Sequence, residues 1–218
     1  PKAGMKNAFE LAWKTHLNKF HKTSDKRMVY EVVSGSEMGS YVIIEGPFSY
    51  ADMDKKLGNE KEHGLDLDKN FFPKLEPQSM NMIVRWADTL SYNGNAEAEK
   101  VIVTVTVVKD GKAAEYMTEA RRNAILAEKL KSPFSYNVFV KQQAGSAPTI
   151  ITVRNLKEGY KELETNYFNL PQNGFRDAYI KDYGQEAWDK RLKLQVDNVV
   201  SREQHFEVFR ADLSSPTK

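Results

Sequence analysis

Apolar residues recur along the first part of this chain with helical spacing and then with the alternation of β-strands. Residues 5–22 place a stripe of mostly apolar side chains three and four positions apart, which predicts an amphipathic helix. The stripe consists of Phe9, Ala12, Trp13, His16, Leu17 and Phe20. Residues 28–33 and 41–45 predict two strands, and the small and polar residues between them predict a hairpin. Ser49 predicts a helix start with Asp52 in its first turn, and residues 82–88 predict a further strand.

The second part of the chain is longer and repeats this order of predicted helices and strands. Strands are predicted at 101–108, 136–141, 149–153 and 205–213, and helices from 113 to 131, at 157–164 and at 185–200. The polar and turn-prone residues 93–100 predict a linker between the two parts.

Short stretches of sequence also recur between the two parts. Tyr30-Glu-Val-Val resembles Tyr136-Asn-Val-Phe, and Ala-Asp-Thr-Leu-Ser91 resembles Ala-Asp-Leu-Ser214. The order of elements in each part is that of a ferredoxin-like βαββαβ unit. We therefore expect an α+β chain with two tandem ferredoxin-like units, residues 1–95 and residues 96–218.

The first unit lacks its opening strand. Lys2-Ala-Gly-Met aligns with Lys109-Asp-Gly-Lys, the turn that follows the opening strand of the second unit. Because the chain begins with Pro1, we expect a processed or trimmed product, for which a removed export signal is one explanation. An exported or periplasmic location is therefore favoured over a cytoplasmic one.

Two consecutive units of this kind, each with a Lys-x-Gly turn before its first helix, resemble the dimeric α/β-barrel proteins. That group includes the antibiotic-biosynthesis monooxygenases, the NIPSNAP-like proteins and the chlorite dismutase-like proteins. The resemblance implies a pseudo-dimeric α/β barrel made by one chain, with ligands bound between its sheets. It does not extend to a haem ligand, because no histidine here matches an axial-ligand motif.

Composition narrows the classes of function. The chain has 32 Lys and Arg against 30 Asp and Glu and lacks a long basic block, which argues against nucleic acid as a partner. The absence of cysteine excludes disulfides, thiolate metal sites and a cysteine nucleophile. No apolar run reaches the roughly 20 residues of a membrane span. Nucleotide-binding and serine hydrolase motifs are also missing, and no cofactor is predicted.

Polar residues within the predicted strands are the candidates for a ligand site. Charges in the middle of a strand are costly when they are buried without partners, so Glu31, Glu45 and Arg85 would need to pair or to face a ligand. The alternative is that they lie at a solvated edge. The full set of candidate ligand-binding residues is Tyr30, Glu31, Glu45, Arg85, Trp86, Asn137 and Arg154. In the alignment of the two units, Asn137 of the second unit takes the place of Glu31 of the first, so the two units differ chemically.

The histidines are interpreted as core or boundary residues, and no metal site is predicted. His16 and His21 are five positions apart, about 140° around a continuous helix, so they would not share an ion. His63 falls in a charged segment, residues 60–68, that is expected to be a loop. The acidic residues Asp66 and Asp68 lack the glycine and glutamate that a calcium loop needs.

An aromatic-rich segment, about 165–183, is present only in the second unit. Tyr167, Phe168, Phe175 and Tyr179 could form a lid over a barrel mouth or a docking patch for a partner. They could equally fill one end of the barrel as additional core.

Three functions remain open from the sequence. The first is a non-catalytic binding or interaction protein that holds a small apolar ligand or docks on a protein partner. The alternative is a cofactor-independent monooxygenase or isomerase that acts on an aromatic or polyketide-like molecule. The third is a structural subunit of an envelope or surface assembly.

Overall fold

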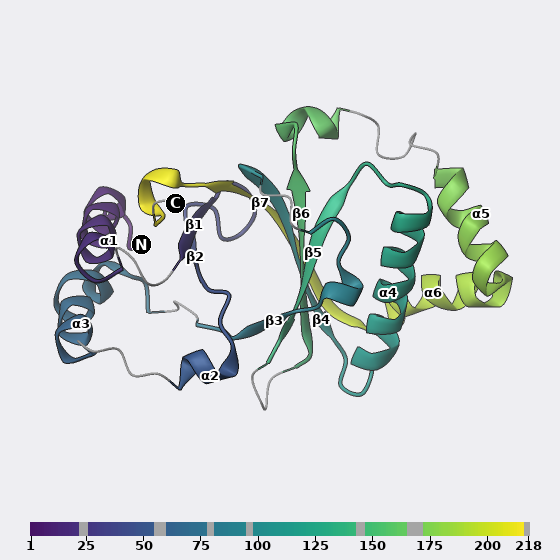
Figure 1. Ribbon diagram of the computed structural model, residues 1–218, viewed down its shortest axis with the longest axis horizontal. Coiled ribbons are helices and arrows are strands. Elements are labelled where there is room, and N and C mark those ends of the chain that lie inside the picture. The colour runs from purple at the N-terminus through teal and green to yellow at the C-terminus, as the bar shows by residue number, and fades with distance from the viewer. Residues whose placement is uncertain are drawn as a thin grey trace. The chain divides into compact units, whose positions relative to one another are not determined.

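The computed structural model describes residues 1–21, 26–54, 60–77, 81–94, 98–142, 147–164 and 172–215 (Figure 1). The chain is α+β. Its strands are hydrogen-bonded in the order β2-β1-β7-β4-β6-β5-β3, and the neighbours β1·β2, β1·β7, β4·β6, β5·β6 and β3·β5 are antiparallel. Two compact units are present: Pro1–Asn81 with Glu207–Lys218, and Met82–Phe206. Strand β7 (Val199–Phe209) contributes to both.

Unit one is a hairpin packed against a helix. Strands β1 (Arg27–Val32) and β2 (Tyr41–Glu45) form the hairpin, and the end of β7 pairs with β1. Helix α1 (Lys6–Phe20) presents its apolar stripe to this sheet, as its period predicts. The buried core consists of Phe9, Trp13, Leu17, Val29, Phe71 and Leu213.

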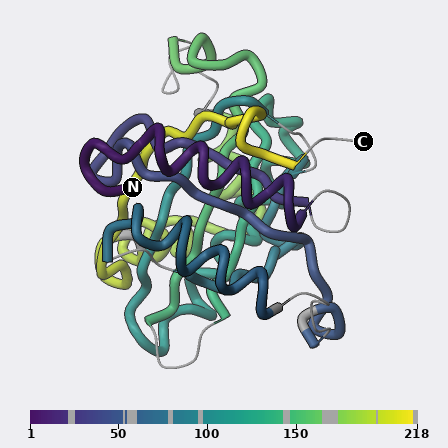
Figure 2. Tube along the Cα trace, turned by 90° about the vertical axis from the view of Figure 1, so that its left-hand side faces the viewer, coloured from purple at the N-terminus to yellow at the C-terminus, as the bar shows by residue number. Residues whose placement is uncertain are grey.

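A helical segment follows the hairpin in unit one. Helix α2 (Tyr50–Met53) begins with the predicted Ser49 cap, and Asp52 completes a capping box. Helix α3 (Glu60–Asp66) continues into a π-helical turn, Leu67–Phe71, and a 3₁₀ turn, Phe72–Lys74. This segment runs beside α1, as both views show (Figures 1 and 2).

Unit two contains a larger sheet with helices on one face. Its strands β3 (Val84–Trp86), β4 (Lys100–Val108), β5 (Ser135–Lys141) and β6 (Thr149–Leu156) join most of β7. Helix α4 (Ala113–Lys129) covers a core that contains Val108, Val138 and Ile150. Helices α5 (Gln172–Tyr183) and α6 (Gln185–Asp197) pack together, and α5 also contacts α4. In the described part of the chain, none of the helices has the length and apolar character of a membrane span.

The compact units differ from the division expected at residue 95. Strand β3, expected to close the first unit, pairs with β5 of unit two. Residues 207–209 at the end of β7, expected to close the second unit, pair with β1 of unit one. Sequence order does not reveal this exchange, because strands that end a unit can pair with either neighbouring sheet edge.

The two short sequence repeats adopt the same local geometry. Ser91 Oγ donates to the Ala87 carbonyl at 2.8 Å and accepts from the Val138 amide at 2.9 Å. Ser214 Oγ makes the equivalent bonds to the Arg210 carbonyl and the Val29 amide at the same distances.

This match makes Val29 the counterpart of Val138, so Met28, rather than Glu31, corresponds to Asn137. The serine bridges thus match the two strands three residues away from the alignment that pairs Glu31 with Asn137. An odd shift of this kind moves a side chain to the other face of a strand.

Candidate metal centre

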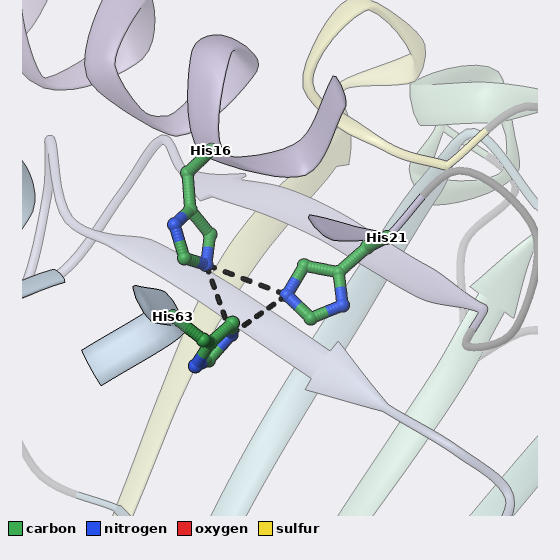
Figure 3. A group of neighbouring side chains, drawn as sticks. All are labelled: His16, His21 and His63. Atoms are coloured by element: carbon green, nitrogen blue, oxygen red, sulfur yellow. Dashed lines mark hydrogen bonds between the residues drawn. The ribbon is translucent and has the colours of Figure 1, made fainter. Parts of the chain in front are cut away.

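Three histidines of unit one converge on one point, with their Nε2 atoms facing one another (Figure 3). The Nε2 atoms of His16 and His63 are 3.1 Å apart, those of His21 and His63 are 3.0 Å apart, and those of His16 and His21 are 3.3 Å apart. His16 and His21 are 1% and 2% exposed, and His63 is half-buried. We call these residues the three-histidine centre.

The end of α1 brings the first two histidines together. His16 lies in the last turns of the helix, on the stripe that faces the core, where its ring stacks on Trp13. His21 is the residue after the helix, with φ −128° and ψ 34°. The chain leaves the helical path there, so the angle of about 140° that separates these positions on a continuous helix does not apply. The expectation that the two histidines lie apart is therefore wrong.

Helix α3 supplies the third histidine. The charged segment that contains it was expected to be a loop, but residues 60–66 are helical. His63, Leu67 and Phe71 are spaced four residues apart, and Leu67 and Phe71 pack on the core of α1 and Val29. This spacing was the available signal for a helix that points His63 toward α1.

Asp66 orients the centre from one turn beyond His63. Its Oδ2 lies 2.7 Å from His16 Nδ1, and its Oδ1 accepts from the Asn70 amide at 2.8 Å. The hydrogen bond with His16 lowers the pKa of Asp66, which keeps the carboxylate ionised. An ionised carboxylate accepts a hydrogen bond from His16 Nδ1–H, so Nε2 carries the lone pair whenever the ring is neutral.

The surroundings of His63 favour its neutral form. Burial lowers its pKa, and the neighbouring His16 and the positive charge of Arg27 act in the same direction, against an opposing effect of Asp66. Neutral imidazole is the form that binds metal ions.

Hydrogen bonds alone do not account for a triangle of three nitrogens. Each contact needs one N–H group and one lone pair, and these cannot alternate around three atoms. In every protonation state, at least one contact therefore joins two lone pairs or two N–H groups. A cation resolves the conflict, because all three lone pairs then point to it.

The dimensions of the triangle fit such an ion. Zinc binds histidine nitrogen at about 2.0 to 2.1 Å, and tetrahedral angles then place two ligand nitrogens about 3.3 to 3.4 Å apart. The observed separations of 3.0 to 3.3 Å are close to this value. Small rotations of the rings would bring all three nitrogens to ligand distance.

The ligand-site candidates in the hairpin do not form one group. Glu31 lies opposite Tyr41 and Glu45 lies opposite Arg27 in the hairpin ladder, four residues and about 13 Å apart. Glu31 bonds to Lys6 of α1 at 2.5 Å, and Glu45 forms an ion pair with Arg27. Both acids thus lie on the face of the hairpin that α1 covers. They do not lie on the opposite face, where a ligand between two sheets would bind.

Glu31 belongs instead to an ion network around Arg210. The Arg210 guanidinium contacts Glu31 at 2.6 Å, Glu10 at 2.8 Å and Asp212 at 2.9 Å. Tyr41 donates to Glu10 at 2.5 Å. Burial and the bond to Glu10 raise the pKa of Tyr41, so its hydroxyl remains a donor. Tyr30, on the opposite face of β1, packs against Phe209.

The candidates in unit two occupy both faces of its sheet. Trp86 is 48% exposed, and its indole N–H donates to Asn137 Oδ1 at 3.1 Å, so these two residues do meet. Arg85 is exposed and lies opposite Val140. Arg154 forms an ion pair with Glu162 at 3.5 Å and lies over the ring of Phe134.

The aromatic segment contributes a helix to the core of unit two. Tyr179 of α5 is fully buried and donates to Glu119 of α4 at 2.5 Å, and its ring contacts Trp188. Phe175 packs against Tyr179. This placement matches additional core and gives no support to a lid formed by these two residues. Tyr167 and Phe168 lie outside the described residues.

Comparison with known proteins identifies a fold and no family. No protein-family model matches the chain, and no curated protein matches its sequence. Among solved structures, a proposed monooxygenase from Lactobacillus acidophilus NCFM is similar with a TM-score of 0.55 and 10% identity. The match covers 97% of this chain and 89% of that protein. At this identity the likeness concerns the fold alone, and it agrees with the α/β-barrel resemblance inferred from the sequence.

Proposed function

We propose that this chain binds a divalent transition metal, with Zn²⁺ as the best-fitting ion, through His16, His21 and His63. The observation that carries the proposal is the triangle of three Nε2 atoms, whose separations suit a common ion and whose three contacts cannot all be hydrogen bonds. Imidazole ligands are typical of zinc, copper, iron and nickel sites. The Asp66 carboxylate behind His16 supplies the outer contact that metal-binding histidines commonly make.

Metal titration of the purified chain tests this proposal. The chain is stripped with a chelator and titrated with Zn²⁺ by calorimetry, and bound zinc is measured after dialysis. His63→Ala removes one ligand at a half-buried position, so it should perturb folding less than a change at His16 or His21. His205→Gln is the matched control, because it removes the fourth histidine of the chain, which belongs to unit two and lies outside the centre.

We expect one Zn²⁺ per chain in the parent and in His205→Gln. We expect at least 100-fold weaker binding in His63→Ala, because two remaining histidine ligands hold zinc poorly. Equal affinity in the parent and His63→Ala, or no binding by the folded parent chain, would contradict the proposal.

A second proposal concerns the face of the unit-two sheet opposite α4. The register of the strands places Val103, Val105, Phe139 and Ile151 on this face, next to the contact between Trp86 and Asn137. We infer that the face holds a small apolar ligand, as the resemblance to the dimeric α/β-barrel proteins implies. Oxygenation or isomerisation of an aromatic or polyketide-like ligand is the enzymatic form of the same proposal.

Binding of the fluorescent probe 1-anilinonaphthalene-8-sulfonate tests the ligand surface. Phe139→Asp should abolish enhanced fluorescence, because it places a charge among apolar side chains. Leu192→Asp makes the same kind of change on exposed α6 and should leave the signal intact. Equal signals in both variants would disprove the assignment of this face. Oxygen uptake or isomer formation with a polycyclic phenol would distinguish the enzyme from the binding protein.

We also propose that the chain is a tandem duplication of a ferredoxin-like unit. The matching serine bridges at Ser91 and Ser214 support it. So do the turns before α1 and α4, where Gly4 and Gly111 have φ of 74° and 75°. The three-histidine centre belongs to the first copy alone. The second copy has Asn123 at the position equivalent to His16 and Glu128 at the position equivalent to His21.

A further inference from the structure

We propose that a metal ion in the three-histidine centre keeps one coordination position open, and that this position takes water or a small anion from solution. The inference rests on metal binding as proposed above and assigns the centre to the reactive class of metal sites. Structural zinc sites have four protein ligands, whereas catalytic sites have three and leave the fourth position to water or substrate.

The ligand set is the first argument. Within the described residues, the group able to hold an ion consists of three histidines, and no carboxylate joins it. Asp66, an acidic side chain in contact with His16, directs Oδ2 to His16 Nδ1 and Oδ1 to Asn70. Its position is therefore that of an orienting residue behind a ligand. Three Nε2 atoms occupy three corners of a tetrahedron and leave the fourth corner vacant.

The burial of the centre is the second argument. His16 and His21 are almost completely buried, but His63 is half-buried, so the centre lies at the edge of the α1 and α3 packing. The ring of Phe20 lies 4.9 Å from that of His16 and 5.2 Å from that of His63, measured between centroids. An ion there would be enclosed by His16 and His21, and we infer that solvent reaches it from the side of His63.

The charge around the centre is the third argument. Arg27, which pairs with Glu45, and Lys19 are basic residues of this region, and the Lys19 ammonium group lies 4.6 Å from the centroid of the Phe20 ring. Positive side chains beside a cationic centre favour an anionic fourth ligand.

The chemistry of such a position follows from the ion. A bound zinc lowers the pKa of its water to about 7, and the hydroxide left after a proton passes to solvent is a nucleophile. The substrates that suit it carry an electrophilic carbonyl or phosphoryl group and a negative charge, and water is the only co-reactant required.

Cobalt substitution tests the open position directly. Co²⁺ is added to the chelator-stripped 218-residue chain, and visible absorption reports both ion binding and coordination. Sodium azide is then titrated as the probe anion. We expect the absorption bands of a site with three nitrogen ligands, followed by a saturable shift of these bands on azide addition. Sodium chloride at equal concentration controls for ionic strength.

The possible outcomes separate the two proposals. The His63→Ala variant should not show the stoichiometric Co²⁺ bands. If the folded parent chain does not show them either, metal binding itself is contradicted. Stoichiometric bands that do not respond to azide would leave metal binding intact and overturn the open position, because a fourth protein ligand would then complete the site. A saturable shift in the parent and in His205→Gln supports the open position.

Discussion

His21 follows the last residue of α1, and its backbone is no longer helical. Its side chain therefore turns back toward His16, one turn earlier, instead of pointing away around the helix. His63 meets both from α3, whose continuation, Leu67–Phe71, packs on the same aromatic core. The three-histidine centre thus depends on where one helix ends and where another packs, and no regular ligand spacing in the sequence marks it.

Asp66 provides the most direct test of this arrangement at the scale of a single residue. Asp66→Asn removes the charge that holds the proton on His16 Nδ1 while it preserves the size of the side chain. We expect zinc affinity to fall about 10- to 100-fold, as is typical when a carboxylate behind a metal ligand is lost. Competition with a chelator of known affinity measures the change.

Asp68→Asn is the control, since Asp68 is exposed and two residues further along the same segment. It should leave zinc affinity unchanged. Equal effects of the two substitutions would show that Asp66 acts only through the general negative charge of the segment.

The sequence predicted the position of one histidine, although it predicted no metal site. The position of His16 on the apolar stripe of α1 was correctly expected, since the helical period fixes it. The meeting with His21 was not predictable, because the exact end of a helix is poorly encoded by local sequence. His63 was missed because its charged neighbours hid the spacing it shares with Leu67 and Phe71.

At the scale of elements, the repeated serine bridges fix two strands in register. Each serine hydroxyl joins a carbonyl at the end of one strand to an amide in the adjacent strand. Ser91→Ala and Ser214→Ala should each lower the free energy of unfolding by about 1 to 2 kcal/mol, since a strand amide loses its partner. Urea unfolding of both variants measures this.

The two losses should be similar, because the two bridges have the same geometry. Ser201→Ala removes an exposed hydroxyl in β7 and serves as the control with an expected change near zero. A loss confined to one of the two bridge variants would argue against their equivalence.

The docking of α5 depends on the hydrogen bond between Tyr179 and Glu119. Tyr179→Phe keeps the buried ring and leaves one oxygen of a buried carboxylate without its donor, although Arg122 still contacts the other oxygen at 2.6 Å. We expect the unfolding free energy to fall by about 1 to 3 kcal/mol. Tyr183→Phe, at a half-buried position, is the control; an equal loss there would contradict the special role of Tyr179.

Most elements were predictable because their periods are strong. The strands at 101–108 and 136–141 and the helices from 6 and from 113 follow from alternation and helical spacing. The serine bridges match these strands three residues away from the alignment that the similarity of Tyr30 and Tyr136 suggests. Hydrogen bonding, rather than side-chain similarity, sets that register.

At the scale of the whole chain, the pairing of strands departs from their order in the sequence. β3 completes the sheet of unit two, and the end of β7 pairs within unit one. The α+β class and the strand alternation were predictable from the chain. The pairing of β3 in unit two and of the end of β7 in unit one was not predictable. A strand has the same pattern of apolar residues whichever neighbouring strand it pairs with.

The Arg210 network ties this C-terminal segment to unit one and predicts how the chain responds to acid. Hydrogen bonds from Arg210 and Lys14 lower the pKa of Asp212. Burial would raise the pKa of Glu10, but bonds from Arg210 and Tyr41 lower it overall. The unfolded chain therefore takes up these protons near pH 4, while the folded chain takes them up only at lower pH.

The stability contributed by these acids should be complete above about pH 5 and decline as the pH falls below about 4, because protonation then favours the unfolded chain. Asp212→Asn should flatten the fall of the unfolding free energy between about pH 4.5 and pH 2.5, whereas Asp110→Asn, at an exposed turn, should not. Since Asp212 is about half exposed, 1 M sodium chloride should weaken the difference. Urea unfolding across this pH range decides the matter: identical slopes for the parent and Asp212→Asn would mean that the pairs of Asp212 with Arg210 and Lys14 do not stabilise the folded chain.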